Sequence, residues 1–270
     1  MKFRLPIVVL LTLSVLLVGA VRFLNGARTP HPKPNHEDVR TPVVIELFTS
    51  EGCSSCPPAD ALLQKLDQSQ PVSGAELIVL SEHVDYWNHI GWTDPYSSHE
   101  YTDRQNAYAN NFGLNTVYTP QMVVDGNFEL VGSDERRVVE AVPEAARMKK
   151  APVCVSLSAS DHKNASIHVE AGPLVSSTDA PQSANVFLGI ADDRDESQVS
   201  RGENAGRSLR HVAVLRDLTR IGTVNASDPF SRDLKLNLNS KSARKLRVVV
   251  IIQEPKVGKI LGAALARLSG

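Results

Sequence analysis

Two cysteines, Cys53 and Cys56, lie three residues apart at the junction between an apolar run, 43–48, and a helical pattern, 59–66. The apolar run predicts a short buried strand, and a strand that leads directly into a helix places both cysteines in the first helical turn. The N-terminus of a helix carries partial positive charge and free backbone N–H groups, which favour a thiolate over a thiol. Two sulfurs on one turn can also close a disulfide with little backbone movement. The spacing therefore predicts a redox-active Cys-Ser-Ser-Cys dithiol.

The two sulfurs are expected to have different roles. Cys53 stands where the helix begins, so we expect it to be the attacking thiolate, exposed at the positive end of the helix. Cys56 is expected to be the resolving thiol that closes the disulfide. Pro57 and Pro58 fit the first helical turn, because the N–H that proline lacks would have no partner within the helix there. We expect no cofactor.

A C-x-x-C pair is also typical of half a zinc site, and two alternatives therefore stay open. Zinc requires further Cys or His ligands at suitable spacing. There is no second C-x-x-C, and the third cysteine, Cys154, lies in a part of the chain with a different pattern. His83, His89 or His99 could complete a metal-handling site with the dithiol, although we predict no set of metal ligands. The other alternative is an inert structural disulfide.

Strand and helix patterns alternate between residues 41 and 150. They predict, in chain order, strand, helix, strand, helix, strand, strand and helix at 43–48, 59–66, 76–80, 98–112, 121–124, 128–131 and 133–148. Gly113 fits the C-cap of the second helix, and Ser133 fits the N-cap of the third. Two parallel crossings, a hairpin and a closing helix are the layout of a thioredoxin-type fold. We therefore predict an α/β thioredoxin-like domain at 41–150, with an insertion at 83–112.

The pattern changes from Ala151 to the end of the chain. Apolar and polar residues alternate in strand-like runs at 153–158, 166–170, 185–190, 208–218, 234–238 and 246–253. Turn-rich pieces such as 192–204 separate them, and 262–268 fits a short terminal helix. This pattern predicts a mostly antiparallel, sandwich-like β domain at 151–270.

Three further residues bear on the dithiol. Thr119 and Pro120 come directly before the strand at 121–124, and in a thioredoxin-type fold a proline at that point is cis, lies beside the dithiol and presents backbone groups to a partner's extended chain. An ordinary trans proline at a strand start is the alternative. Glu46 is a carboxylate within a strand that we expect to be buried on both faces. It could accept the proton of Cys56, or it could lie on a solvated side of the sheet.

A dense group of polar and aromatic residues follows the second predicted strand. Open α/β sheets bind ligands at the carboxyl ends of their strands, so this group could line the substrate site. Its members are His83, Asp85, Tyr86, Trp87, Trp92 and Asp94. The alternative is that the two tryptophans form the core of the insertion.

The start of the chain indicates export. Lys2 and Arg4 precede an uncharged run, 5–21, that ends in small residues, which is typical of a signal peptide and sits at the short limit for a membrane anchor. We expect a signal peptide or signal-anchor at 1–27, a linker at 28–40, and a periplasmic or extracellular body that residues 5–21 could tether to a membrane. The net charge of −1 across 270 residues does not favour nucleic-acid binding.

Several long motifs of the chain resemble a family of secreted, thioredoxin-like proteins of unknown activity, the domain of unknown function 1223. The resemblance runs from about Val43 to the end, and the motifs that carry it are 44–60, 83–87, 91–92, 117–121 and 202–207. Asn88 stands where the family pattern has an aspartate. The resemblance implies the fold and the export more than it implies an activity.

Two functions from different classes remain open at this point. The first is an exported thiol-disulfide oxidoreductase that acts on a protein or on a small thiol or disulfide, with Thr119 and Pro120 as its substrate platform. The second is a binding or scaffold module in which the β domain recognises a partner and Cys53–Cys56 is a structural disulfide. The acidity and the reduction potential of the dithiol distinguish the two.

Overall fold

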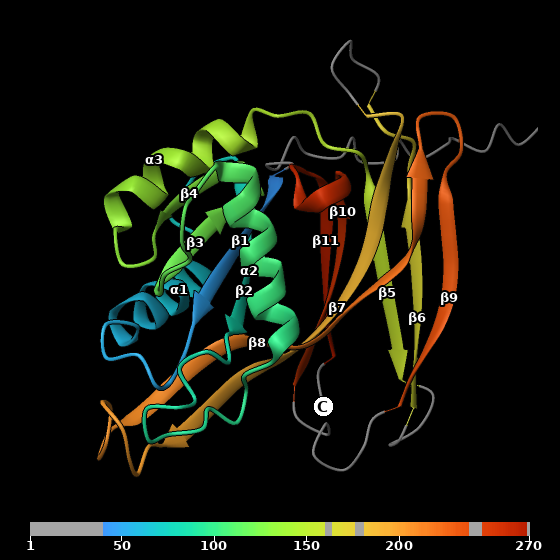
Figure 1. Cartoon of the computed structure of the whole chain (residues 1–270). Helices are drawn as coiled ribbons and strands as arrows, with labels where there is room; N and C mark the ends of the chain where they lie inside the picture. The colour runs from blue at the N-terminus through green and yellow to red at the C-terminus, as the bar shows by residue number, and fades with distance from the viewer. Residues whose placement is uncertain (1–39, 160–163, 176–180, 238–244, 269–270) are drawn as a thin grey trace, which may run out of the picture. The chain divides into compact units, whose positions relative to one another are not determined.

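The computed structural model describes residues 40–159, 164–175, 181–237 and 245–268 (Figure 1). The expected signal or anchor segment at 1–27 and the linker up to residue 39 lie outside the described residues. None of the helices in the described ranges is long and apolar enough to cross a membrane.

The first part of the chain supplies four strands and three helices. Their order is β1 (Thr41–Thr49), α1 (Pro57–Ser69), β2 (Ala75–His83), α2 (His99–Phe112), β3 (Gln121–Val124), β4 (Phe128–Val131) and α3 (Glu135–Ala146). The element types predicted for this part are confirmed. Gly113 is the left-handed C-cap of α2, as expected, whereas the N-cap of α3 is Asp134 and not Ser133. Asp134 caps the helix because its carboxylate accepts a hydrogen bond from the backbone N–H of Arg137.

The second part of the chain is formed by strands. Its strands are β5 (Val153–Ala159), β6 (Asn164–Ala171), β7 (Ser183–Gln198), β8 (Ser208–Asn225), β9 (Phe230–Asn237), β10 (Leu246–Gln253) and β11 (Ile260–Leu268), with a short 3₁₀ turn, η1 (Pro255–Val257), before β11. Two expectations were wrong. β7 continues through half of the predicted turn at 192–204, and the predicted helix at 262–268 is strand β11. Both segments are held by cross-strand pairing, β7 with β8 and β11 with β10, which overrides local propensity.

Within the described residues, strands from both parts form one mixed sheet of eight, in the order β11-β10-β7-β8-β2-β1-β3-β4, and β5, β6 and β9 form a second sheet (Figure 1). β2 pairs in parallel with β1 on one side and with β8 at Ser81–Val214 on the other. The predicted fold class, an α/β thioredoxin-like domain followed by a sandwich-like β domain, is therefore wrong. The edge of β2 that a separate first domain would leave open is instead paired with the second half of the chain.

Alternation along β1 determines what each face of the large sheet contacts. Val43, Ile45 and Leu47 pack against α1 and α3, whereas Val44 and Phe48 belong to the core on the α2 side. At the other end of the large sheet, β6 packs against β7 and β10. The Cys53–Cys56 segment follows β1 directly, and so it lies at the end of a strand that is buried on both faces.

Candidate functional site

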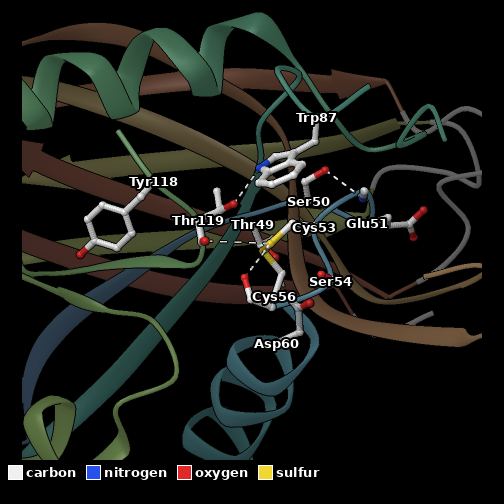
Figure 2. The surroundings of a disulfide bond; sticks show 12 residues. Thr49, Ser50, Glu51, Cys53, Ser54, Cys56, Asp60, Trp87, Tyr118 and Thr119 are labelled. Carbon is white, nitrogen blue, oxygen red and sulfur yellow. Dashed lines mark hydrogen bonds between the residues drawn. A yellow bond between two sulfur atoms is a disulfide. The ribbon is translucent and has the colours of Figure 1, made fainter. Parts of the chain in front are cut away.

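Cys53 and Cys56 form a disulfide at the start of α1, with their Cα atoms 5.5 Å apart (Figure 2). Cys56 is the N-cap residue of α1, and Pro57 and Pro58 occupy its first two positions. The helix is hydrogen-bonded from its start, since the N–H of Asp60 donates to the carbonyl of Cys56 at 3.1 Å. The disulfide therefore lies at the positive end of an intact helix, where a thiolate is favoured.

Both cysteine side chains are fully buried, so the expectation that Cys53 is exposed was wrong. The Sγ of Cys53 lies 3.3 Å from the hydroxyl of Ser55 and 4.0 Å from the carbonyl oxygen of Thr119. These neighbours are polar, and Ser55 is itself a surface residue.

The structure brings three of the predicted site residues together around this sulfur. The Thr119–Pro120 peptide bond is cis, as expected. The indole N–H of Trp87 donates to the hydroxyl of Thr119 at 2.7 Å, and Figure 2 shows Trp87, Thr119 and Cys53 side by side. Residues from three separate segments of the chain therefore line one sulfur atom.

Glu46 is directed to the other face of the sheet. Its carboxylate accepts a hydrogen bond from Nε of Arg104 at 2.7 Å and from the hydroxyl of Tyr108 at 2.5 Å, both on α2. Nε of Arg104 also lies 3.6 Å from the carboxylate of Glu82. Burial and the nearby charge of Glu46 raise the pKa of Glu82 well above its ordinary value. Glu46 therefore belongs to a buried network on α2 and does not reach Cys56.

A second buried polar cluster lies under the dithiol loop, and sequence reasoning assigned no role to its central residues, Glu51, Asp60 and His211. The carboxylate of Glu51 binds Nε2 of His211 at 3.1 Å and accepts the indole N–H of Trp92 at 2.8 Å. Asp60 accepts the hydroxyl of Thr49 at 3.0 Å, and its carboxylate lies 3.8 Å from Nδ1 of His211. Figure 2 shows Asp60 next to Cys56. The sequence did contain one signal for Asp60. It is a carboxylate in the first turn of the predicted helix, four residues after Cys56, and this spacing places the two side chains on the same helix face.

His211 carries a positive charge in this cluster. Burial alone would lower its pKa, but the nearby carboxylate of Asp60, the hydrogen bond to Glu51 and the negative charges of both groups raise it to about 10. A second imidazole, that of His83, stacks edge-on against His211 and binds Asp94 through Nδ1 at 2.7 Å. The dithiol therefore lies above the buried carboxylates of Glu51 and Asp60 and the buried imidazole of His211 that contacts them.

The six residues named as candidates for a substrate site are divided between three places. Trp87 contacts the sulfur's neighbour Thr119, whereas His83, Trp92 and Asp94 belong to the buried cluster below. Asp85 accepts the hydroxyl of Thr102, and the hydroxyl of Tyr86 donates to Gln105, both on α2. Figure 2 shows Trp87 beside Cys53.

A loop from the second half of the chain holds the dithiol segment. The amide of Asn204 donates to the backbone carbonyls of Glu51 and Cys53, each at 2.9 Å. The carboxylate of Glu203 accepts the backbone N–H of Ser54 at 3.0 Å. Contacts between residues 149 to 153 positions apart cannot be inferred from spacing along the chain, although the motif 202–207 carries part of the family resemblance.

Two clefts open beside the first turns of α1. One, of about 260 Å³, is lined by residues that include Pro57, Asp60 and Arg210, and the other, of about 520 Å³, includes Gln64, Arg210 and His211. In the described ranges, no three His, Cys, Asp or Glu side chains are grouped so as to hold a metal ion.

A family model described as "Protein of unknown function (DUF1223)" matches residues 44–253. The chain belongs to the DUF1223 family. The match includes the dithiol, the Thr119–Pro120 bond and the loop with Glu203 and Asn204. No curated protein matches this DUF1223 chain.

Two solved structures resemble this DUF1223 protein over most of its length. A structural-genomics target from Agrobacterium tumefaciens is 27% identical with a TM-score of 0.63, and the match covers 86% of this chain and 98% of that one. HBP35 of Porphyromonas gingivalis is 13% identical with a TM-score of 0.55, over 84% of this chain and 75% of that one. The second likeness shows the fold alone.

Proposed function

We propose that the protein is an exported thiol-disulfide oxidoreductase that acts through Cys53 and Cys56. The observation that carries the proposal is the position of the disulfide at the start of α1, where the Cys53 sulfur lies 3.3 Å from the hydroxyl of Ser55 and 4.0 Å from the carbonyl oxygen of Thr119. A helix N-terminus stabilises the thiolate that exchange requires. The substrate is a protein or a small molecule that carries a thiol or disulfide.

The exchange proceeds in two balanced steps when the reduced protein meets a disulfide substrate. The Cys53 thiolate attacks one substrate sulfur, the substrate S–S bond breaks, and the other substrate sulfur leaves as a thiolate that takes a proton from solvent. Cys56 then attacks the Cys53 sulfur and releases the bound half of the substrate as a second thiolate. Two electrons pass to the substrate, and the Cys53–Cys56 bond forms. The reverse sequence oxidises a substrate dithiol.

The second step requires a group that takes the proton of Cys56. Asp60 lies beside Cys56, whereas the carboxylate of Glu46 is held by Arg104 and Tyr108 on the opposite face (Figure 2). Asp60 and His211 both border the clefts beside α1, which gives this proton a short path to solvent. In this proposal Asp60 has the role that the sequence suggested for Glu46.

The proposed location is the periplasm or the cell exterior. It is supported by the charged start and the uncharged run at 5–21, and by the tendency of disulfides to persist in oxidising compartments. The same run could tether the protein to a membrane, with the folded part on the outer side.

Trapping with a serine variant tests the proposed chemistry. In Cys56→Ser, attack by Cys53 on a disulfide reagent or on oxidised test proteins should stop at a mixed disulfide that accumulates and that added thiol releases. In Cys53→Ser no such adduct should form at Cys56, because its sulfur is not the attacking one. Mass spectrometry of both variants in a Cys154→Ser background gives the result. Equal adducts in both variants, or none in either, would contradict the proposal.

The second candidate function is a binding module with a structural disulfide. The complete burial of both sulfurs favours it, because structural disulfides are protected from exchange. The position of Cys53 at the start of α1, with a hydroxyl and a carbonyl oxygen beside its sulfur, favours the first candidate. The reduction potential of the disulfide separates the two.

A further inference from the structure

The connection between β7 and β8 reaches back to the dithiol and binds its backbone. Asn204 is fully buried and donates to the carbonyls of Glu51 and Cys53, while its own side-chain oxygen accepts a guanidinium N–H of Arg207 at 3.0 Å. Its side-chain oxygen and nitrogen therefore both have partners, so the loop is fixed against the dithiol segment. This attachment places Glu203, the neighbour of Asn204, at the backbone N–H of Ser54.

The amide of Ser54 is the first backbone donor after Cys53. Amides at the start of a helix are among the groups that stabilise a thiolate. Here the Ser54 N–H donates to the carboxylate of Glu203 instead, and this carboxylate also brings a negative charge next to the residue that follows Cys53. Hydrogen bonds from Ser54 lower the pKa of Glu203, and so this carboxyl is ionised at neutral pH.

We propose that Glu203 makes Cys53 a weaker acid and thereby makes the dithiol a stronger reductant, with Asn204 as the residue that positions Glu203. An effect of Glu203 on turnover rests on the proposed function. Its effect on the acidity of Cys53 does not depend on that function. Reduction of Cys53–Cys56 by a dithiol takes two electrons and two protons and gives two thiols, of which Cys53 can then lose its proton to solvent. A neighbouring negative charge disfavours that thiolate, and it therefore shifts the equilibrium towards the disulfide.

Other charged groups also face the dithiol segment from the elements packed against it. They are Glu51 after β1, Asp60 on α1, Asp94 and His83 beyond β2, Arg207 in the same loop and His211 on β8. None of them accepts a hydrogen bond from the Ser54 amide in the described structure. A change at Glu203 alone leaves this set in place, so a matched comparison isolates its effect.

The experiment measures the acidity of Cys53 directly. In a Cys56→Ser, Cys154→Ser background Cys53 is the single thiol of the chain, since the sequence has three cysteines. Its alkylation rate against pH gives the midpoint of thiolate formation. Glu203→Gln should lower this midpoint, so that the thiolate fraction below it rises about two- to fivefold. Glu196→Gln is the matched control. Glu196 is exposed like Glu203, but its carboxylate contacts Ser208 and Arg210 instead of the Ser54 amide, so its loss should not move the midpoint.

A second comparison tests the positioning role. Asn204→Ala should also lower the midpoint, and adding Glu203→Gln to it should then change little, because Glu203 is no longer held. Fully additive shifts would overturn the role of Asn204. A third measurement uses the chain with all three cysteines, equilibrated with a reference thiol and its disulfide. At pH values above the Cys53 midpoints of the wild type and of the variant, Glu203→Gln should increase the fraction of the protein that is reduced.

The outcomes distinguish this inference from the proposed function. An unchanged or raised midpoint in Glu203→Gln, in a protein whose Cys56→Ser form still traps mixed disulfides, overturns this inference alone. A lowered midpoint in a protein that traps none leaves the tuning by Glu203 established and overturns the proposed exchange.

Discussion

Replacing Arg104 with methionine is expected to lower the free energy of unfolding by about 3–5 kcal/mol. The guanidinium is nearly buried, with a side chain 8% exposed, and it faces the carboxylates of Glu46 and Glu82, which are both 0% exposed. Methionine keeps much of the volume but leaves Glu46 charged without a cation in the core. Urea unfolding at neutral pH measures the loss.

A surface arginine supplies the matched control for this prediction. Arg136 pairs with Glu140 on α3, and both side chains are largely exposed. Arg136→Met should therefore change the stability by less than about 1 kcal/mol. Adding Glu46→Gln to Arg104→Met should restore part of the loss, since it removes the uncompensated charge. A loss for Arg104→Met as small as that of the control would show that this network does not hold a buried ion pair.

The stability of the protein is expected to fall as the pH rises from about 6.5 towards 10, because His211 is charged only in the folded state over this range. Its folded pKa, about 10, lies above the ordinary value of 6.5, so the stabilisation is complete below pH 6.5 and is lost as the pH rises through 10. The difference between the two pKa values corresponds to stabilisation on the order of 3–5 kcal/mol. His211→Gln should remove it, so that the variant is much less stable than the wild type at pH 6 and approaches it near pH 10.

Denaturant unfolding of both oxidised proteins across this pH range measures the difference curve. Groups that titrate in both proteins cancel in that difference. His168→Gln removes a histidine from the exposed face of β6, and it should leave the slope nearly unchanged because solvent screens its acidic partners. A difference between wild type and His211→Gln that stays constant from pH 6 to 10 would mean that His211 is neutral in the folded protein.

Local features of the chain were predictable because local physics determines them. The strand, dithiol and helix at 43–66 follow from hydrophobic periodicity, and Gly113 ends α2 because glycine tolerates the left-handed backbone of a C-cap. Residue pattern likewise placed the hairpin of β3 and β4. The family motifs at 83–87 and 202–207 indicated that these segments mattered, without showing why.

The fold class and the centre of the site depended on contacts that no local pattern contains. The Ser81–Val214 pair joins the two halves into one sheet, and periodicity does not state which strands pair. Glu46 is a carboxylate in the strand that leads to the dithiol, as the proposed proton acceptor would be. Side chains alternate between the two faces of a strand, however, and Glu46 lies on the face towards Arg104 of α2. His211 reads as one more polar residue of a strand, and its role arises from the carboxylates that the fold brings to it.

The equilibrium reduction potential of Cys53–Cys56 tests the central claim most directly. Equilibration of the full chain with thiol-disulfide buffers, followed by alkylation and mass spectrometry, gives the fraction reduced at each potential. A redox-active dithiol should lie between about −270 and −120 mV, the range of known thiol-disulfide oxidoreductases. A value below about −300 mV is typical of structural disulfides and would contradict the account.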